Sequence, residues 1–280
     1  MKIIDAFCFF NELDMLELRL RVLDPHVDHF VIVEADHTFS GKPKESVYLK
    51  NQKRFEEFAG KITHHFVRID AGKLDFSSRP DKLDRSTDFW KVEFMQRNAV
   101  AEVLKSFDPE DLAIVSDVDE FPALQAIDEI RGSAWRRFLV KHFPFAFEQA
   151  EFYYNAGNLR DSPWNGSIIA SCRKFIELSP QKLRDRRNKI FRIRKGGYHF
   201  SYFMTPEQIA LKISSFAHQE LNTEENRSEA RIAGCVGSGK DLFGRQVNTV
   251  GVDLNYFPQE IRTQLLKYPL FCGAGSLGRQ

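Results

Sequence analysis

The sequence predicts an α/β fold in which a mostly parallel sheet is covered by helices on both faces. Strand-length apolar runs alternate with helix-like segments, and this order favours parallel strands joined by helical crossovers. The runs are continuously apolar, which is typical of strands that are buried on both faces. With 280 residues, of which 28% are charged, the chain has the length and composition of a folded globular protein.

Four strands are expected in the first part of the chain, at residues 3–10, 29–34, 62–69 and 112–115. Asp5 alone interrupts the first run. Leucines at helical spacing predict a helix after this strand, and Asp24 and Pro25 end the pattern. Residues 46–58 have mixed helical character, and residues 87–107 form the longest helical pattern.

The second part predicts a mixed arrangement, with strands at residues 138–154 and 166–175 and a strand pair or a strand followed by a turn at residues 190–203. Thr205 and Pro206 are typical of a helix start, and a further helix is expected to begin at Thr223.

The sequence favours a single domain. Because no spacer rich in Pro, Gly or Ser divides the chain, we expect one domain over residues 1–272, with sub-regions at 1–122 and 123–272 and a tail at 273–280.

Composition limits the partners and the compartment. Lysine plus arginine (40) nearly balances aspartate plus glutamate (39), so no global field attracts nucleic acid, which we do not expect as a partner. Carboxylates follow the N-terminus too soon for a signal peptide. The sequence also lacks the run of about 18 apolar residues that would predict a membrane span. We therefore expect a cytoplasmic protein, which also fits four scattered cysteines without C-x-x-C spacing.

Two local patterns suggest other functions. Residues 234–240 match part of a P-loop, but Asp241 occupies the Ser/Thr position and a helix is expected before it, so we reject this reading. The basic run at residues 182–195 is interpreted as a solvated face or as a loop near bound phosphates.

Polar residues follow three of the predicted strands. Ligands of open parallel sheets bind beyond the carboxyl ends of the strands. This places Asn11 and Glu12, residues 34–37 and residues 117–120 on one rim.

The acidic pair Asp117 and Asp119 is the main candidate on that rim. Two close carboxylates repel each other, and a divalent cation relieves the repulsion. Mg²⁺ or Mn²⁺ takes such oxygen ligands and completes its shell with water and substrate phosphate. The alternative is an acidic helix start, with Pro122 opening the helix.

Several segments in the same order resemble glycosyltransferase family 17: IIDAFCFFNELDMLELRL, VDHFVIVEADHTFSGKPK, DPEDLAIVSDVDEFP, GGYHFSYFMTPEQIALKISSFAHQE and KDLFGR. The resemblance implies a GT-A-type fold, a UDP-sugar donor, a divalent metal (Mn²⁺ or Mg²⁺) and inversion at the sugar carbon. It further implies transfer of N-acetylglucosamine to a carbohydrate acceptor. Residues 1–122 would then form the nucleotide-sugar half and residues 123–272 the acceptor half.

By the same resemblance, Asp117 and Asp119 hold the metal and the diphosphate, and His199 is the candidate third ligand. The alternative for His199 is a hydrogen-bonded histidine in an aromatic strand. Lys212 is a candidate partner of the diphosphate or a solvent-facing lysine. Arg97 is a candidate for binding the donor or the carboxylates of the motif, with a surface arginine as the alternative.

Three further polar residues lie where such folds bind the uridine and the ribose: Asn11, Glu12 and Glu34. Carboxylate and amide groups can accept hydrogen bonds from the uracil N–H or the ribose hydroxyls. For Glu12, capping of the following helix is an equal alternative.

The acceptor side offers an aromatic and amide cluster and several carboxylates. Tyr153 and Trp164 suit stacking on sugar rings and Asn155 suits hydrogen bonds to sugar hydroxyls, although core packing explains the tyrosine equally well, and we expect Trp164 in an exposed loop. Inversion requires a general base. The candidates are Glu148, Glu151 and Asp161, and the odd spacing of the first two predicts that they face opposite sides of a strand.

Two other functions compete with glycosyl transfer. A glycoside hydrolase needs carboxylates that flank the glycosidic bond, and two carboxylates on one turn are poorly placed for this. A glycan-binding protein that keeps the fold without turnover is the third possibility.

Overall fold

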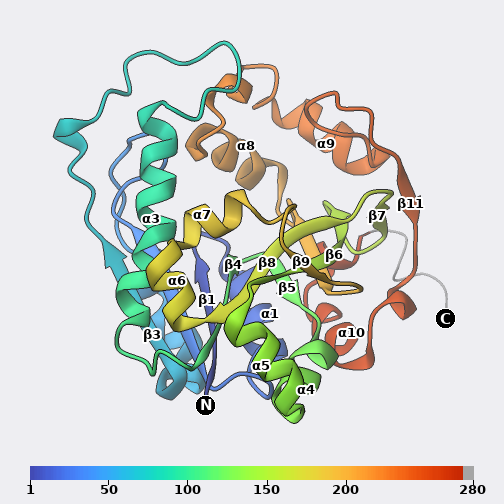
Figure 1. Cartoon of the computed structure of the whole chain (residues 1–280). Coiled ribbons are helices and arrows are strands. Elements are labelled where there is room, and N and C mark those ends of the chain that lie inside the picture. The colour runs from blue at the N-terminus through green and yellow to red at the C-terminus, as the bar shows by residue number, and fades with distance from the viewer. Residues whose placement is uncertain (274–280) are drawn as a thin grey trace.

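The computed structural model describes residues 1–273, so the predicted tail lies outside them except for Gly273. A parallel sheet forms the first half, in the order β4-β1-β2-β3. Its members are β1 (Ile3–Cys8), β2 (His29–Ala35), β3 (Ile62–Val67) and β4 (Leu112–Asp117). All four predicted strands are confirmed, and their carboxyl ends share one edge of the sheet (Figure 1).

Helical segments connect these strands, as predicted. They are α1 (Leu13–Leu23), α2 (Val47–Lys50), the 3₁₀ helices η1 (Gln52–Lys61) and η2 (Ala71–Lys73), and α3 (Asp88–Leu104). The mixed helical character expected at residues 46–58 corresponds to a short α-helix followed by 3₁₀ helix.

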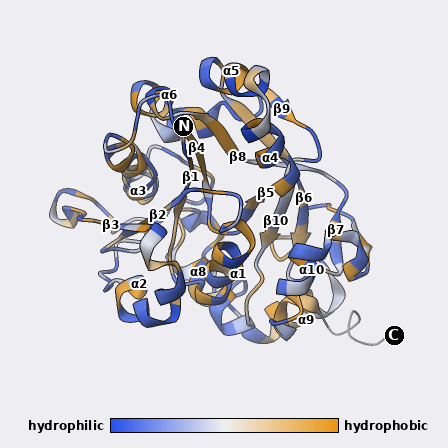
Figure 2. Cartoon of the chain, turned by 90° about the horizontal axis from the view of Figure 1, so that it is seen from below, coloured by the Kyte–Doolittle hydropathy of each residue, from blue (hydrophilic) through white to orange (hydrophobic). Residues whose placement is uncertain are grey.

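Successive side chains of a strand point to opposite faces of the sheet. Helices cover both faces, so both sets of side chains are buried. Ile3 of β1 packs in a core with Leu16 of α1, whereas Ile4 packs in a second core with Val100 of α3. Figure 2 shows the apolar central strands between helices whose outer surfaces are more hydrophilic. The predicted α/β class with helices on both faces is confirmed.

The second half extends the sheet with mixed strands. β8 pairs antiparallel with β4, and β6, β7 and β11 continue from it in that order. β9 and β10 pair parallel with β6, and β5 pairs antiparallel with β10. The bounds are β5 (Glu120–Pro122), β6 (Phe145–Tyr153), β7 (Asn158–Arg160), β8 (Trp164–Ser171), β9 (Phe191–Ile193), β10 (Gly197–Ser201) and β11 (Thr249–Gly251).

The two strands predicted at residues 190–203 are confirmed as β9 and β10. They do not pair with each other, and each pairs with β6 instead. Gly197 is required at the start of β10 because its φ is +126° and a Cβ there would lie 2.0 Å from the carbonyl oxygen of Phe121.

Three predicted boundaries in the second half are wrong. Residues 138–142 belong to α5 (Ala134–His142), and residues 172–175 belong to α6 (Cys172–Leu178). Serine side chains cap both helices, since Ser133 accepts from the N–H of Arg136 and Ser171 from that of Lys174. The helix expected at Thr223 begins later, as α9 (Glu229–Ser238).

The remaining helices are α4 (Leu124–Gly132), α7 (Pro180–Asp185), α8 (Pro206–Ser215), η3 (Gln219–Leu221), η4 (Leu254–Tyr256), α10 (Gln259–Leu265) and α11 (Pro269–Cys272). Thr205 forms a capping box with Gln208, which confirms the predicted start of α8. The P-loop-like residues lie mostly within α9, so the helical context predicted for them is confirmed. Among residues 1–273, no helix is long and apolar enough to cross a bilayer.

Candidate active site

A cavity of about 520 Å³ opens at the carboxyl ends of β1, β2 and β4, and we call it the strand-end cavity. The loops after these strands supply Glu12, His37, Asp117 and Asp119 to its wall, as the strand order predicted. The second half of the chain supplies further polar residues to the wall, among them Trp164, Arg184, Arg187, His199 and Lys212.

A fully buried arginine, Arg19 of α1, fixes the backbone of the acidic motif. Its guanidinium binds both carboxylate oxygens of Asp5 at 2.6 and 2.7 Å. It also donates to the carbonyl oxygens of Val118 at 3.1 Å and Glu120 at 2.7 Å. Sequence reasoning missed Arg19, and the one signal for it was Asp5, the lone carboxylate in an apolar run.

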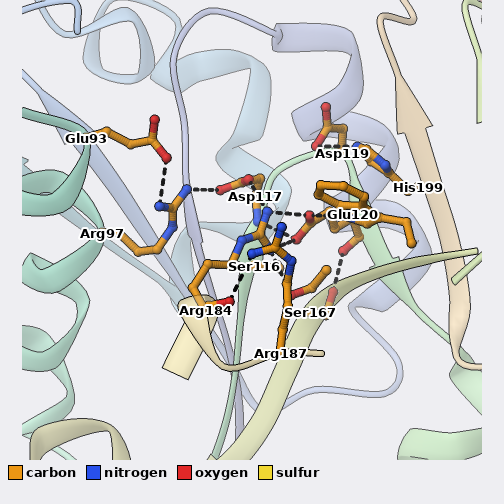
Figure 3. Close-up of polar contacts among 12 residues, drawn as sticks. Glu93, Arg97, Ser116, Asp117, Asp119, Glu120, Ser167, Arg184, Arg187 and His199 are labelled. Atoms are coloured by element: carbon orange, nitrogen blue, oxygen red, sulfur yellow. Dashed lines mark hydrogen bonds and ion pairs between the residues drawn. The ribbon is translucent and has the colours of Figure 1, made fainter. Parts of the chain in front are cut away.

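Asp117 is held by two arginines from different helices (Figure 3). Arg97 of α3 donates to Oδ1 at 3.0 Å, and Arg184 of α7 donates to Oδ2 at 2.7 Å. Burial alone would raise the pKa of Asp117, but the two guanidiniums hold this pKa well below its usual range. Of the roles considered for Arg97, the structure shows the contact with the motif's carboxylate. The alternative of a helix start is wrong, because β5 follows the motif and α4 begins only at Leu124.

Asp119 differs from Asp117 because no hydrogen bond reaches its carboxylate within the described residues. Its side chain is buried, with His199 Nε2 3.7 Å from Oδ1 and Lys212 Nζ 3.5 Å from Oδ2. Burial raises the pKa of Asp119, despite the opposing charge of Lys212. The structure therefore brings Asp119, His199 and Lys212 together, as the sequence predicted, and leaves a buried carboxylate without a close donor.

Glu120, which was not predicted as a site residue, completes the acidic cluster. Arg184 donates to both of its carboxylate oxygens at 2.7 Å, and Trp164 Nε1 donates to Oε1 at 2.6 Å. Trp164 is half-buried at the start of β8 and stacks against His199, with ring centroids 5.1 Å apart. Trp164 thus lies in the strand-end cavity beside the acidic motif, and the prediction of an exposed loop is wrong.

Glu12 lines the cavity, but Asn11 does not. The Glu12 carboxylate accepts from Lys212 at 3.2 Å and from the backbone N–H of Asn11 at 3.0 Å. Glu12 occupies the N-cap position of α1 without forming a side-chain cap, so the capping alternative is not observed. Asn11 lines a separate small recess.

Glu34 lies in the core rather than in the strand-end cavity, so the structure does not support its predicted contact with the donor. The buried carboxylate accepts from Lys44 at 2.5 Å, Ser46 at 2.7 Å and the N–H of Val47 at 2.6 Å. His64 Nε2 is 3.2 Å from the same carboxylate. Although burial opposes it, these donors lower the pKa of Glu34 to about 2. Glu34 therefore anchors the segment after β2.

We expect Glu34→Gln to lower the free energy of unfolding by about 1–3 kcal/mol at neutral pH, because charge-assisted hydrogen bonds are lost from a buried group. The folded-state pKa of Glu34 is depressed, so this contribution is present above about pH 4.5 and disappears as the pH falls towards 2. Urea unfolding of both proteins across this pH range measures it. Nucleotide binding should be unchanged. If the variant keeps its stability but loses nucleotide binding, Glu34 contacts the donor after all.

Two of the predicted acceptor residues lie outside the cavity wall. Tyr153 is buried in a core with Ile209 and Ile213, which is the packing alternative. The side chain of Asn155 accepts from the N–H of Gly157 at 2.9 Å and stabilises a turn.

The three carboxylates predicted as candidate bases also lie outside the cavity wall. Glu148 pairs with Arg192 at 3.6 Å, and Asp161 accepts from Asn248 at 3.0 Å. Glu151 is the closest to the site, 3.6 Å from His199 Nδ1. The different partners of Glu148 and Glu151 agree with the opposite facing predicted for them.

The basic run at residues 182–195 contributes directly to the cavity. Arg184 is buried there, and Arg187 stacks on Trp164 with its guanidinium carbon 5.1 Å from the ring centre. Within residues 1–273, Arg187 has no acidic partner, and it donates to the carbonyl oxygen of Arg184 at 3.0 Å. Burial and the neighbouring Arg184 lower the pKa of Arg187, although the charges of Glu120 and Asp117 oppose this shift. The run therefore combines cavity residues with exposed ones, and its proximity to bound phosphates stays a prediction.

A divalent metal fits part of the predicted ligand set. Among the described residues, no group of three or more His, Cys, Asp or Glu side chains is arranged as a metal site. Asp119 and His199 face each other without a hydrogen bond, as two ligands of one cation would. Both oxygens of Asp117 are instead occupied by arginines. Two protein ligands are sufficient for Mg²⁺ or Mn²⁺ when phosphate and water complete the shell.

The fold and the cavity define an α/β protein with a cavity of paired acidic and basic side chains at the carboxyl ends of parallel strands. The profile of glycosyltransferase family 17 matches residues 1–249. The chain belongs to glycosyltransferase family 17.

The curated relatives are distant and longer. The β-1,4-mannosyl-glycoprotein 4-β-N-acetylglucosaminyltransferase of Homo sapiens is 23% identical, and that of Rattus norvegicus is 24% identical. Each match covers 88% of this chain and 49% of the relative, so the chain spans about half the length of these proteins.

Solved structures with some likeness include the galactosyltransferase LgtC, with 13% identity, 95% of this chain and 100% of that chain covered, and a TM-score of 0.35. The glycosyltransferase GlyE of Streptococcus pneumoniae has 13% identity, a TM-score of 0.30, and covers 67% of this chain and 39% of its own. At these scores the likeness adds nothing to the family assignment.

Proposed function

We propose that this chain transfers a sugar from a nucleoside diphosphate, with UDP as the expected nucleotide, to a carbohydrate acceptor with inversion. The sugar expected from the names of the relatives is N-acetylglucosamine. The family membership supports glycosyl transfer rather than hydrolysis. The observation that carries the proposal is the set of cations, Arg97, Arg184 and Lys212, that surrounds the strand-end carboxylates in the cavity.

The cationic residues are proposed to bind the diphosphate. Arg187 has a guanidinium in the cavity without an acidic partner, and Lys212 bridges Glu12 and Asp119. Guanidinium groups match phosphate oxygens by paired hydrogen bonds, and lysine acts as a point charge. Because these donors are fixed before the donor sugar binds, they stabilise the charge that develops on the leaving diphosphate.

The acidic residues are proposed to have different roles. Asp119 and His199 are proposed to hold Mn²⁺ or Mg²⁺, which would neutralise negative charge on the diphosphate as the bond to the sugar breaks. Asp117 is proposed to orient Arg97 and Arg184 towards the phosphates, since its two oxygens bind these side chains. Trp164, through its hydrogen bond to Glu120 and its stacking on His199, keeps these groups in place.

We propose that the nucleoside binds against an aromatic part of the cavity wall. Trp90 lines the cavity, and its buried Nε1 has no hydrogen-bond partner among residues 1–273. Phe9, Phe39 and Phe216 line the cavity as well. An aromatic wall with a free N–H donor suits a flat base that carries a carbonyl oxygen, such as uracil.

A donor screen tests the proposed function. Purified protein is incubated with UDP- and GDP-sugars, with and without Mn²⁺, and released nucleotide and glycosylated products are analysed by mass spectrometry. Metal-stimulated release of UDP, with an N-acetylhexosamine added to a carbohydrate, is the expected result. Glycan binding that is unaffected by UDP or metal, without any release of nucleotide, would instead favour the non-catalytic alternative.

Arg187→Met is expected to weaken UDP binding about tenfold or more, because a charge-assisted contact with phosphate is lost. Folding stability should not fall, since Arg187 leaves no anion behind when it is removed. Isothermal titration with UDP and with uridine separates the phosphate contribution, and uridine binding should be unchanged. Arg186→Met is the matched control, because Arg186 is exposed beside it. Equal UDP affinity of both variants would exclude Arg187 from phosphate binding.

A further inference from the structure

Four large aromatic rings on α5, β9 and the residue after α5 are exposed, and none of them lines the strand-end cavity. Trp135 is 66% exposed, Phe138 48%, Phe143 46% and Phe191 59%. Trp135 and Phe138 stack along α5, and Phe143 contacts Phe191 of β9 with ring centroids 5.9 Å apart. Phe143 directly follows α5, and Figure 2 places α5 and β9 at the same edge of the fold. The four rings thus belong to one apolar surface.

A basic segment of the chain carries one of these rings, Phe191. Residues 182–195 contain eight basic residues and a single acidic one, Asp185, which pairs with Arg85 at 2.7 Å. Within residues 1–273, no acidic partner binds the exposed side chains of Arg186, Lys189, Arg194 and Lys195. Because the whole chain has a net charge of only +1, positive charge is concentrated here and the remainder is net acidic. We call the four rings and these four side chains the aromatic–basic surface.

We infer that the aromatic–basic surface docks this protein on an anionic lipid bilayer. Tryptophan and phenylalanine insert at the headgroup level of a membrane, and lysine and arginine bind the anionic headgroups beside them. The protein then lies on the membrane by this side without spanning it. Arg187 of the same segment lines the strand-end cavity, so the docked side adjoins the cavity wall.

Charge and ring geometry favour lipid over two other occupants. A second copy would bring two cationic surfaces together, which costs free energy through repulsion. Single-stranded nucleic acid requires open ring faces on which bases stack. Trp135 and Phe138 instead stack on each other, with ring centroids 5.7 Å apart and planes at 14°.

Co-sedimentation with vesicles tests the inference, using the full chain. Strong binding is expected to vesicles of equal parts phosphatidylcholine and phosphatidylglycerol, weak binding to phosphatidylcholine alone, and a loss of binding at high salt. The double variant Arg194→Glu/Lys195→Glu should weaken binding more than tenfold, since each basic residue near an anionic surface contributes about fivefold. Trp135→Ser/Phe191→Ser should also weaken binding. These four side chains are exposed, so the variants should keep the circular dichroism spectrum and UDP affinity of the wild type.

Matched controls lie on another side of the molecule, where Leu49 and Lys53 are exposed. Leu49→Ser and Lys53→Glu should bind the anionic vesicles like the wild type. The inference is overturned if anionic vesicles do not bind at low salt, or if the control variants lose as much binding as the test variants. It is equally overturned if Trp135→Ser/Phe191→Ser dissociates a dimer, or if a single-stranded oligonucleotide binds more tightly than the vesicles through the same residues. Because sugar transfer is not measured, the outcome is independent of the proposed function.

Discussion

Asp119→Asn is expected to lower kcat by about 10²- to 10³-fold. The reason is that the asparagine side chain would hold the proposed Mn²⁺ or Mg²⁺ less well, and this cation stabilises the negative charge of the leaving diphosphate. Asp119 is a buried carboxylate whose nearest basic side chains, Lys212 and His199, are 3.5 and 3.7 Å away, so the structure leaves its oxygens available to a ligand. The substitution keeps the size of the side chain. Initial rates with a UDP-sugar at several Mn²⁺ concentrations measure the effect, and the concentration of Mn²⁺ required should rise.

Asp117→Asn is the informative comparison for Asp119→Asn. It removes the negative charge that holds Arg97 and Arg184, so UDP binding should weaken even when no metal is added. Asp119→Asn should weaken mainly the metal-dependent part of UDP binding, measured by titration calorimetry with and without Mn²⁺. If Asp119→Asn binds UDP and Mn²⁺ as tightly as the wild type and keeps its kcat, the proposed metal site is wrong.

Arg19→Met is expected to lower the free energy of unfolding by about 3–5 kcal/mol, because it leaves Asp5 as an uncompensated buried charge. Arg19 and Asp5 are both fully buried, and the same guanidinium binds two backbone carbonyl oxygens of the motif loop. Urea unfolding followed by circular dichroism measures the loss. Activity of the folded fraction should also fall, since the loop that carries Asp119 loses its fixed backbone.

The double variant Asp5→Leu/Arg19→Met separates these two effects. Replacing a buried ion pair by apolar side chains restores much of the stability lost in the single variant. Activity should stay low, because the carbonyl oxygens of Val118 and Glu120 still lack their donor. A double variant that recovers both stability and activity would show that Arg19 serves the fold alone.

The strand ends could be predicted from the sequence, but the direction of each side chain could not. Asp119 and Glu34 both follow continuous apolar runs, and both were expected on the binding rim. Glu34 instead points into the core beside Tyr48, where Lys44 and Ser46 fold back on it. In a strand buried on both faces, apolar side chains surround every position, so the pattern does not tell which face a carboxylate takes.

Tertiary packing brings residues of the second half to the site, and no local sequence pattern predicts this packing. His199 and Lys212 were found because their segments resemble those of the family, and both lie beside Asp119. Arg184 is 67 positions after Asp117, and only the packing of α7 near α3 brings it to the motif. The basic run that contains Arg184 was visible in the sequence, although its two interpretations could not be separated there.

The distribution of charge along the chain has a consequence for biosynthesis. When the ribosome has completed the parallel half, Asp117, Asp119 and Glu120 are in place, but of the cations that bind them only Arg19 and Arg97 have been made. Arg184, His199 and Lys212 follow 64, 79 and 92 residues after Glu120. Until then the cluster is a group of poorly compensated anions, which opposes early compaction of the nascent chain. The site is therefore completed late in synthesis, and its last partners arrive together with the second half of the sheet.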